Sequence, residues 1–202
     1  MGTKQIAHKP ACFSSLGKAA AIAAFGMQLL ASPMMAGCKK APGEEPTLFS
    51  NDMKTVATLV SSGTDLNPRN NFGDTPLILA VSRGNNEIAE LLITKGADME
   101  AKDRNGWTAL MWAINEGNKK IVEPLIANGA NVNATDREGR TPLMRAASDG
   151  RKEIAELLIA KGADVNAMDA YGRTALKSAT AGFTDTGHMQ TADVLRKNGA
   201  TE

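Results

Sequence analysis

The sequence is poor in the residues that carry most catalytic chemistry. Its 202 residues include two histidines, two cysteines and only 4% aromatic side chains. His188 is the only histidine after residue 37, and no nucleophile motif stands near it. Because a nucleophile needs a base within hydrogen-bonding reach, we expect no catalytic site of the Ser–His–Asp or Cys–His type.

The acidic residues recur singly along the sequence and do not gather in groups. The recurring acids are Asp98, Asp103, Asp136, Asp164 and Asp169. Metal sites need clustered His, Cys or carboxylate ligands, so we assign these acids to turns and helix starts and expect no metal. No glycine-rich phosphate loop follows a strand pattern either, and we expect no cofactor. An enzyme that uses His188 or the acids stays open as an alternative.

The charge of the chain is nearly balanced. There are 23 basic and 22 acidic residues, and residues 1–37 hold three lysines and no acid. The rest of the chain therefore has 20 basic residues against 22 acidic ones. This balance does not indicate the strongly basic surface that nucleic-acid binding needs, and we expect no nucleic-acid partner.

The first 37 residues differ in kind from the rest. A lysine-bearing start leads into an uncharged, alanine-rich run over residues 19–37, which Cys38 follows directly. A basic start, an apolar middle and a small-residue exit are typical of a secretory signal peptide. The run Met35-Ala36-Gly37-Cys38 resembles a bacterial lipoprotein box, although Met35 stands where leucine is usual. The resemblance implies cleavage before Cys38 and lipidation of that cysteine.

Residues 38–47 have linker composition, with Pro42, Gly43 and Pro46. Removal of Cys12 and lipidation of Cys38 would leave no thiol, which suits an oxidising compartment. We expect a periplasm-facing protein of the bacterial cell envelope that a lipid anchors to a membrane, and we favour the outer membrane over the inner one. A soluble periplasmic or secreted form, and a retained anchor or cytosolic form, are the alternatives.

After residue 47, one phrase recurs four times at a step of 33 residues. Its copies begin at Gly73, Gly106, Gly139 and Gly172 and read GDTPL, GWTAL, GRTPL and GRTAL. A second phrase begins at Gly63, Gly96, Gly129 and Gly162 and keeps the same step. A fixed period of this length is typical of stacked-repeat proteins, in which each unit buries its apolar face against its neighbours.

The residue pattern of each repeat predicts two helices and a polar loop. Thr75 can cap a helix that begins at Pro76. Gly84 breaks that helix, a second apolar helix follows, and Gly96 ends it. The predicted repeats lie at about residues 48–69, 70–102, 103–135, 136–168 and 169–202.

These phrases resemble the ankyrin repeat over residues 48–202. The resemblance implies an all-α ankyrin-repeat solenoid with helix–loop–helix units joined by hairpin loops. About four full repeats would follow an N-terminal partial cap. It also implies that a protein partner binds on a concave face made by the hairpins and the first helices. We expect a monomer.

The chain departs from the family pattern in three places. The usual histidine is absent, and Ile78, Met111, Met144 and Lys177 stand in its place. Pro124 lies inside a predicted second helix, where it should remove a hydrogen bond to Lys120 and soften the helix. Four extra residues lie in the last repeat, and we expect them between its two helices.

Positions that vary from repeat to repeat at the hairpin tips and first-helix ends are the candidate binding residues. They are Phe72, Asp74, Arg83, Arg104, Trp107, Glu116, Arg137, Arg140, Tyr171 and Arg173. Aromatic residues and arginine are enriched at binding hot spots. Trp112 could serve packing or contact. We therefore predict a non-catalytic protein-interaction module, with a secreted effector that binds host proteins and a structural spacer as alternatives.

Overall fold

The computed structural model describes residues 47–181 and 185–201. The expected signal peptide, Cys38 and nearly all of the linker lie outside these described residues.

Regular structure in the described residues consists of nine α-helices, and these residues contain no strand. The helices are α1 (Met53–Ser61), α2 (Pro76–Ser82), α3 (Asn86–Thr94), α4 (Ala109–Asn115), α5 (Lys119–Ala127), α6 (Pro142–Ser148), α7 (Lys152–Ala160), α8 (Ala175–Thr180) and α9 (Thr186–Lys197). The predicted all-α class is confirmed.

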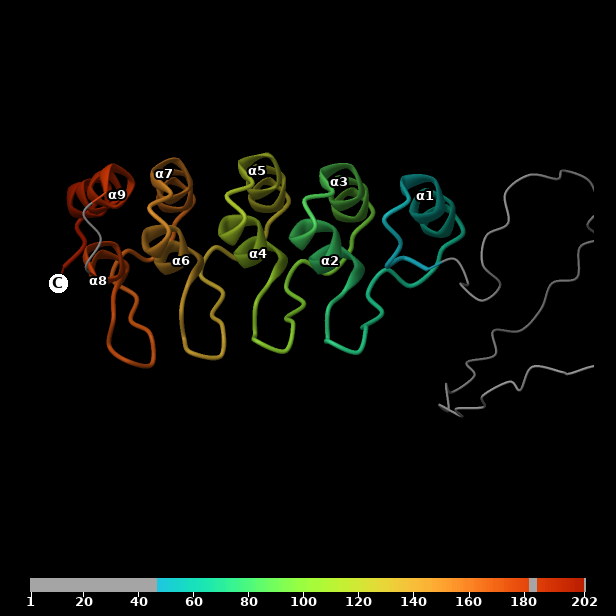
Figure 1. The fold of residues 1–202 in the computed structure, drawn as a ribbon, viewed down its shortest axis with the longest axis horizontal. Coiled ribbons are helices and arrows are strands. Elements are labelled where there is room, and N and C mark those ends of the chain that lie inside the picture. The colour runs from blue at the N-terminus through green and yellow to red at the C-terminus, as the bar shows by residue number, and fades with distance from the viewer. Residues whose placement is uncertain (1–46, 182–184, 202) are drawn as a thin grey trace, which may run out of the picture. The chain divides into compact units, whose positions relative to one another are not determined.

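The helices stand in two rows, as Figure 1 shows. The short helices α2, α4, α6 and α8 pack side by side and form the inner row, and each also packs against the helix that follows it. Helices α1, α3, α5, α7 and α9 form the outer row (Figure 1). The long loops that lead into the inner helices all extend to the same side of this stack (Figure 1). This arrangement is the solenoid that the 33-residue period predicts.

A threonine begins every inner helix. Its hydroxyl oxygen accepts a hydrogen bond from the backbone N–H three residues later, with lengths of 3.3–3.4 Å. The four capping residues are Thr75, Thr108, Thr141 and Thr174. Pro76 and Pro142 occupy the first helical position after two of these caps, where no N–H is needed. The recurring Thr-Pro-Leu phrase thus marks the start of an inner helix, as predicted.

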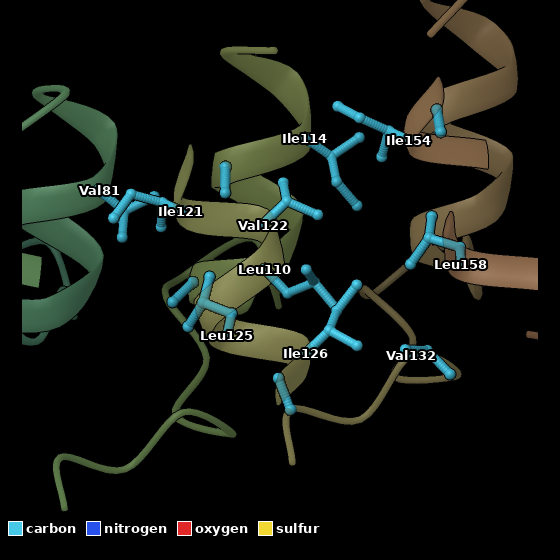
Figure 2. Close-up of a cluster of buried hydrophobic side chains, with 14 of the residues drawn as sticks. Val81, Leu110, Ile114, Ile121, Val122, Leu125, Ile126, Val132, Ile154 and Leu158 are labelled. Carbon is cyan, nitrogen blue, oxygen red and sulfur yellow. The ribbon is translucent and has the colours of Figure 1, made fainter. Parts of the chain in front are cut away.

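The hydrophobic core lies between successive repeats, and each outer helix contributes to it on two sides. Figure 2 shows this for α5: Ile121 and Leu125 lie on the side toward Val81 of α2, whereas Val122 and Ile126 lie on the side toward Ile154 and Leu158 of α7. Ile121, Val122 and Leu125 are completely buried. A repeat therefore cannot bury its apolar side chains without both neighbours.

Small and adaptable side chains let the inner helices approach one another. The alanines at one repeat position, Ala80, Ala113, Ala146 and Ala179, are all buried. Ile78, Met111 and Met144 stand where the family's histidine is usual and are buried too. In these three repeats, apolar packing therefore replaces the hydrogen bonds of a histidine. Lys177 at the same position is exposed on α8, in the last repeat.

The N-terminal end is closed by one outer helix and a short segment. Helix α1 packs against α3, which makes it the outer helix of an incomplete repeat. Leu48 is buried, and the Arg83 side chain donates a hydrogen bond of 3.1 Å to the carbonyl oxygen of Phe49. Residues 47–51 thus cover α2 in place of a missing inner helix, and the predicted partial cap is confirmed.

The four extra residues of the last repeat do not all lie between its helices, as the sequence led us to expect. Helix α9 has 12 residues and α7 has 9, so three of the extra residues lengthen α9 at its start. Asp185 caps this longer helix by accepting a hydrogen bond from the His188 backbone N–H. The prediction was wrong in this respect because a new capping residue can begin a helix one turn earlier.

Helix α5 continues through Pro124 and has the same length as α3 and α7, nine residues. Proline has no N–H, so the carbonyl oxygen of Lys120 loses the helical partner that it would otherwise have. We expect the backbone amides of residues 118–128 to exchange with solvent faster than those of residues 151–161, the equivalent segment around α7. Hydrogen exchange followed by NMR or mass spectrometry measures this difference.

The control is Pro124→Leu, which restores the residue type of Leu91 and Leu157 in the sister helices. We expect it to slow exchange across α5, because an interior proline costs a helix about 3 kcal/mol when nothing relieves it. Exchange in residues 118–128 that is already as slow as in residues 151–161 would contradict the prediction.

Candidate functional site

The hairpin loops are held in shape by one side chain at the start of each. A side-chain oxygen of this residue accepts hydrogen bonds from the backbone N–H groups two and four residues later, at 2.7–2.9 Å. The four residues are Asn70, Asp103, Asp136 and Asp169. The three aspartates are 8% exposed. The turn role that the sequence predicts for them is confirmed.

The second polar atom of this residue has a different partner in each repeat. The Nδ2 group of Asn70 donates to Asp74 at 3.0 Å. The Oδ2 atom of Asp103 accepts from Trp112 Nε1 at 3.1 Å. Trp112, whose role the sequence left open, therefore supports the loop. The corresponding bonds in the next two loops join Arg140 Nε to Asp136 at 2.8 Å and Arg173 Nε to Asp169 at 2.7 Å.

These bonds change the charge properties of the last loop. Burial by itself would raise the pKa of Asp169, but hydrogen bonds from the backbone and side chain of Arg173 lower it on balance. The bond to Asp169 in turn raises the pKa of Arg173. Arg173 and Asp169 therefore form a stable charged pair, and the guanidinium of Arg173 is already oriented before any partner arrives.

Neighbouring loops are joined to one another at their tips. The Arg137 N–H donates to the carbonyl oxygen of Asn105 at 3.3 Å, and the Ala170 N–H donates to that of Glu138 at 2.9 Å. The aliphatic part of Arg137 packs over Gly106, since a Cβ atom built on Gly106 would lie 3.1 Å from Arg137 Cγ. The three loops of residues 103–107, 136–140 and 169–173 therefore form one connected surface. We call this surface, with the first turns of α4, α6 and α8, the hairpin face.

Aromatic side chains lie on or near this face with different exposure. Phe72 and Tyr171 are each 69% exposed. Trp107 is only partly exposed, because its ring packs against Trp112 at a centroid distance of 4.8 Å. Arg173 lies over the ring of Tyr171, with 4.9 Å between the guanidinium carbon and the ring centroid. The face thus offers apolar surface at Tyr171, and Trp107 forms part of its support, whereas Phe72 belongs to the preceding loop of residues 70–74.

Arg145 of α6 is a functional candidate that sequence reasoning missed. It is half-buried, and its guanidinium carbon lies 4.1 Å from the centroid of the Trp107 ring. Burial lowers the pKa of Arg145, and the neighbouring charge of Arg140 lowers it further. The equivalent residues are Leu79, Trp112 and Ser178, so this position varies between repeats as the chosen tip positions do. That variation could have revealed it.

The remaining predicted binding residues lie toward the ends of the inner helices. Arg83 directly follows α2 as its C-cap residue, and its side chain donates a hydrogen bond to the carbonyl oxygen of Phe49. Glu116 ends α4, is exposed, and accepts a hydrogen bond of 3.2 Å from Asn115 Nδ2. The structure therefore brings Arg104, Trp107, Arg137, Arg140, Tyr171 and Arg173 together on three joined loops, and it leaves Phe72, Asp74, Arg83 and Glu116 outside that group.

His188 is held between two elements. It is 8% exposed, and its Nε2 atom lies 2.9 Å from the carbonyl oxygen of Ser148 at the end of α6. A carbonyl oxygen only accepts, so Nε2 donates the hydrogen bond. The Nδ1 atom contacts the carboxylate of Asp185, and the pKa of Asp185 is lowered first by the His188 N–H and then by the ring. These contacts give His188 a part in fixing α9 to the stack.

We expect His188→Ala to lower the free energy of unfolding by about 2 kcal/mol, because the carbonyl of Ser148 loses a partner and a buried ring is removed. Denaturation in urea measures the change. Met189→Ala, at a neighbouring position that is 60% exposed, is the control, and we expect it to stay within about 0.5 kcal/mol of the parent protein. Equal losses in the two variants would show that His188 does not fix α9.

The part of the chain that the structure describes offers neither a metal-ligand cluster nor a membrane-spanning helix. No three His, Cys, Asp or Glu side chains in that part lie together as a metal site would require. None of its helices has the length and apolar character to cross a membrane.

Comparison with known proteins agrees with this geometry. A family model for ankyrin repeats in three copies matches residues 48–136 and, in a second match, residues 117–201. A search of curated proteins gave no match. The family matches cover most of the chain, and the same residues form the stacked helix pairs with joined hairpin loops. The chain therefore belongs to the ankyrin repeat family.

Proposed function

We propose that this protein is a non-catalytic interaction module that binds a protein partner on its hairpin face, the concave side expected from the family resemblance. Ankyrin repeats generally mediate protein–protein interactions, and proteins built from them are generally non-catalytic. The observation that supports this face is the joining of three loops through the Asn105–Arg137 and Glu138–Ala170 hydrogen bonds. The joined loops carry arginine and tyrosine side chains.

Order in the loops before binding favours affinity. A partner that meets flexible loops must supply the free energy needed to order them. Here Asp103, Asp136 and Asp169 already hold the loop backbones, and Asp136 and Asp169 also orient two of the arginines. A partner that binds this face would therefore lose little affinity to ordering of the protein.

Site-specific photocrosslinking tests the proposed face. A photoreactive phenylalanine analogue replaces Tyr171 in the full chain, which is expressed in its native host and irradiated. We expect a discrete crosslinked partner. The matched control places the analogue at Glu90, an exposed position on outer helix α3, and should give no adduct. Adducts of the same kind from both positions, or from Glu90 alone, would contradict binding at the hairpin face.

We also propose that the protein works in the bacterial cell envelope as a lipoprotein attached through Cys38. The support is the sequence of residues 1–38, with its basic start, alanine-rich run and Ala-Gly-Cys ending. Mass spectrometry of the mature protein should find an acylated cysteine at its N-terminus. Cys38→Ser should release the protein from the membrane fraction. An unmodified N-terminus at another residue would favour a soluble periplasmic or secreted form.

A further inference from the structure

Positive charge on the hairpin face gathers around a single loop. Arg104 lies in the loop of residues 103–107, and Arg137 is bonded to this loop through Asn105. Arg145 reaches the same loop from α6 and stacks on Trp107. Three arginines therefore lie in or beside one loop, although nothing in the net charge of the chain indicates such a concentration.

Within the described residues, these three arginines form no ion pair, unlike the two other arginines of the hairpin face. Arg140 pairs with Asp136 at 2.8 Å and with Glu138 at 3.2 Å, and Arg173 pairs with Asp169. Among residues 47–181 and 185–201, by contrast, no acidic side chain forms an ion pair with Arg104, Arg137 or Arg145. Asp149, Asp136 and Glu138 act on Arg145 only from beyond ion-pair distance.

The outer face provides an internal comparison. Lys119 of α5 lies 3.6 Å from Glu123, and Lys152 of α7 lies 4.0 Å from Glu156. Lys119 and Lys152 on the outer helices thus each have a carboxylate partner within their own helix. On the hairpin face, Arg104 and Arg137 are exposed and form no ion pair with any described residue.

We propose that the hairpin face binds an extended acidic segment of a protein partner, whose carboxylates pair with Arg104, Arg137 and Arg145. This inference rests on the proposed function and names the chemistry of the partner. Arg104 and Arg137 occupy the same place in successive repeats, and packed helices lie roughly 8–10 Å apart. An extended chain advances about 3.3 Å per residue. Acidic side chains at every third position of the segment therefore match the repeat spacing.

The same arrangement disfavours nucleic acid as the occupant. Single-stranded nucleic acids bind through aromatic rings on which their bases stack. The ring of Trp107 is covered by Arg145 and packs against Trp112, so it offers no free face for a base.

A synthetic peptide of about twelve residues, with glutamate at every third position, tests the proposal. Its binding to the full chain is followed by fluorescence anisotropy at low salt. We expect Arg104→Gln/Arg137→Gln/Arg145→Gln to weaken binding at least about tenfold, since each exposed ion pair contributes roughly two- to fivefold. Binding of the peptide to the parent protein should also weaken as salt rises.

The matched control removes three positive charges from the outer helices. It is Lys119→Gln/Lys120→Gln/Lys152→Gln, and it should bind the peptide as the parent does. Arg104→Gln/Arg137→Gln changes only exposed residues and should show most of the loss even if the Arg145 change disturbs the fold. Equal losses in the outer-helix control, or unchanged binding when the glutamates become glutamines, would overturn the proposal. Tighter binding of a single-stranded oligonucleotide would overturn it too.

The crosslinking experiment separates this proposal from the one on which it rests. If Tyr171 captures a partner but the acidic peptide does not bind, the acidic segment is wrong and the interaction module stands. If neither binds at the hairpin face, both proposals fail. Peptide binding that needs the three arginines supports the acidic segment directly.

Discussion

Replacement of Leu125 by alanine should lower the free energy of unfolding by about 3–5 kcal/mol, which is among the largest losses available in this chain. Leu125 is completely buried on α5, on the side toward α2, as Figure 2 shows. The truncation leaves a cavity between two repeats, and every contact across that interface weakens. Because a stacked repeat depends on its neighbours, damage in the middle of the stack affects repeats on both sides.

Urea denaturation followed by circular dichroism measures this loss. Met168→Ala is the control, since it also shortens an apolar side chain but at a position that is 69% exposed. We expect that control to change stability by no more than about 0.5 kcal/mol. A loss below about 1 kcal/mol for Leu125→Ala would mean that the interface closes around the cavity, and would count against a rigid core between repeats.

Gly106→Ala should be the most damaging single change in the hairpin loops. Gly106 has a backbone φ of +82°, and a Cβ atom there would lie 2.8 Å from the backbone nitrogen of Arg137 in the next loop. The left-handed conformation alone costs roughly 1–2 kcal/mol for a residue with a side chain. The clash adds to this cost because backbone cannot move aside as a flexible side chain can. We expect a total of about 3 kcal/mol.

Gly129→Ala supplies the matched control. Gly129 has a φ of +93°, and nothing lies within 4 Å of a Cβ atom built on it. It should therefore show the conformational cost without the clash, about 1–2 kcal/mol. Gly106→Ala should also shift the NMR amide signal of Arg137, which Gly129→Ala should leave in place. Equal losses of stability and an unmoved Arg137 signal would contradict the close approach of the two loops.

The features of the fold that depend on nearby residues were predictable from the sequence. A threonine followed by proline and leucine begins a helix through contacts within three residues, and Thr75 and Thr141 behave as predicted. The period of 33 residues then sets the stacking, because each repeat packs against a copy of itself. The lengthened α9 was not predicted, since a count of residues does not say which of them form helix.

The candidate site was only partly predictable, because it depends on contacts between repeats. The Arg137–Asn105 hydrogen bond joins residues in different loops, and Arg145 reaches Trp107 from a helix of the following repeat. No motif within one repeat encodes such contacts. The sequence selected Arg140 and Arg173 as free binding residues, whereas each also holds its own loop through an aspartate.

In each hairpin loop, a few positions hold the backbone in shape, and the positions between them vary from repeat to repeat. Asp136 and Gly139 determine the backbone of their loop. Asp136 Oδ1 accepts hydrogen bonds from the backbone N–H groups of Glu138 and Arg140, so the side chains of Arg137 and Glu138 have no part in these two bonds. Mutations at such intervening positions can change what the surface recognises while the loop keeps its shape. Under the proposed function, a single substitution at such a position would change the preferred partner without a loss of stability.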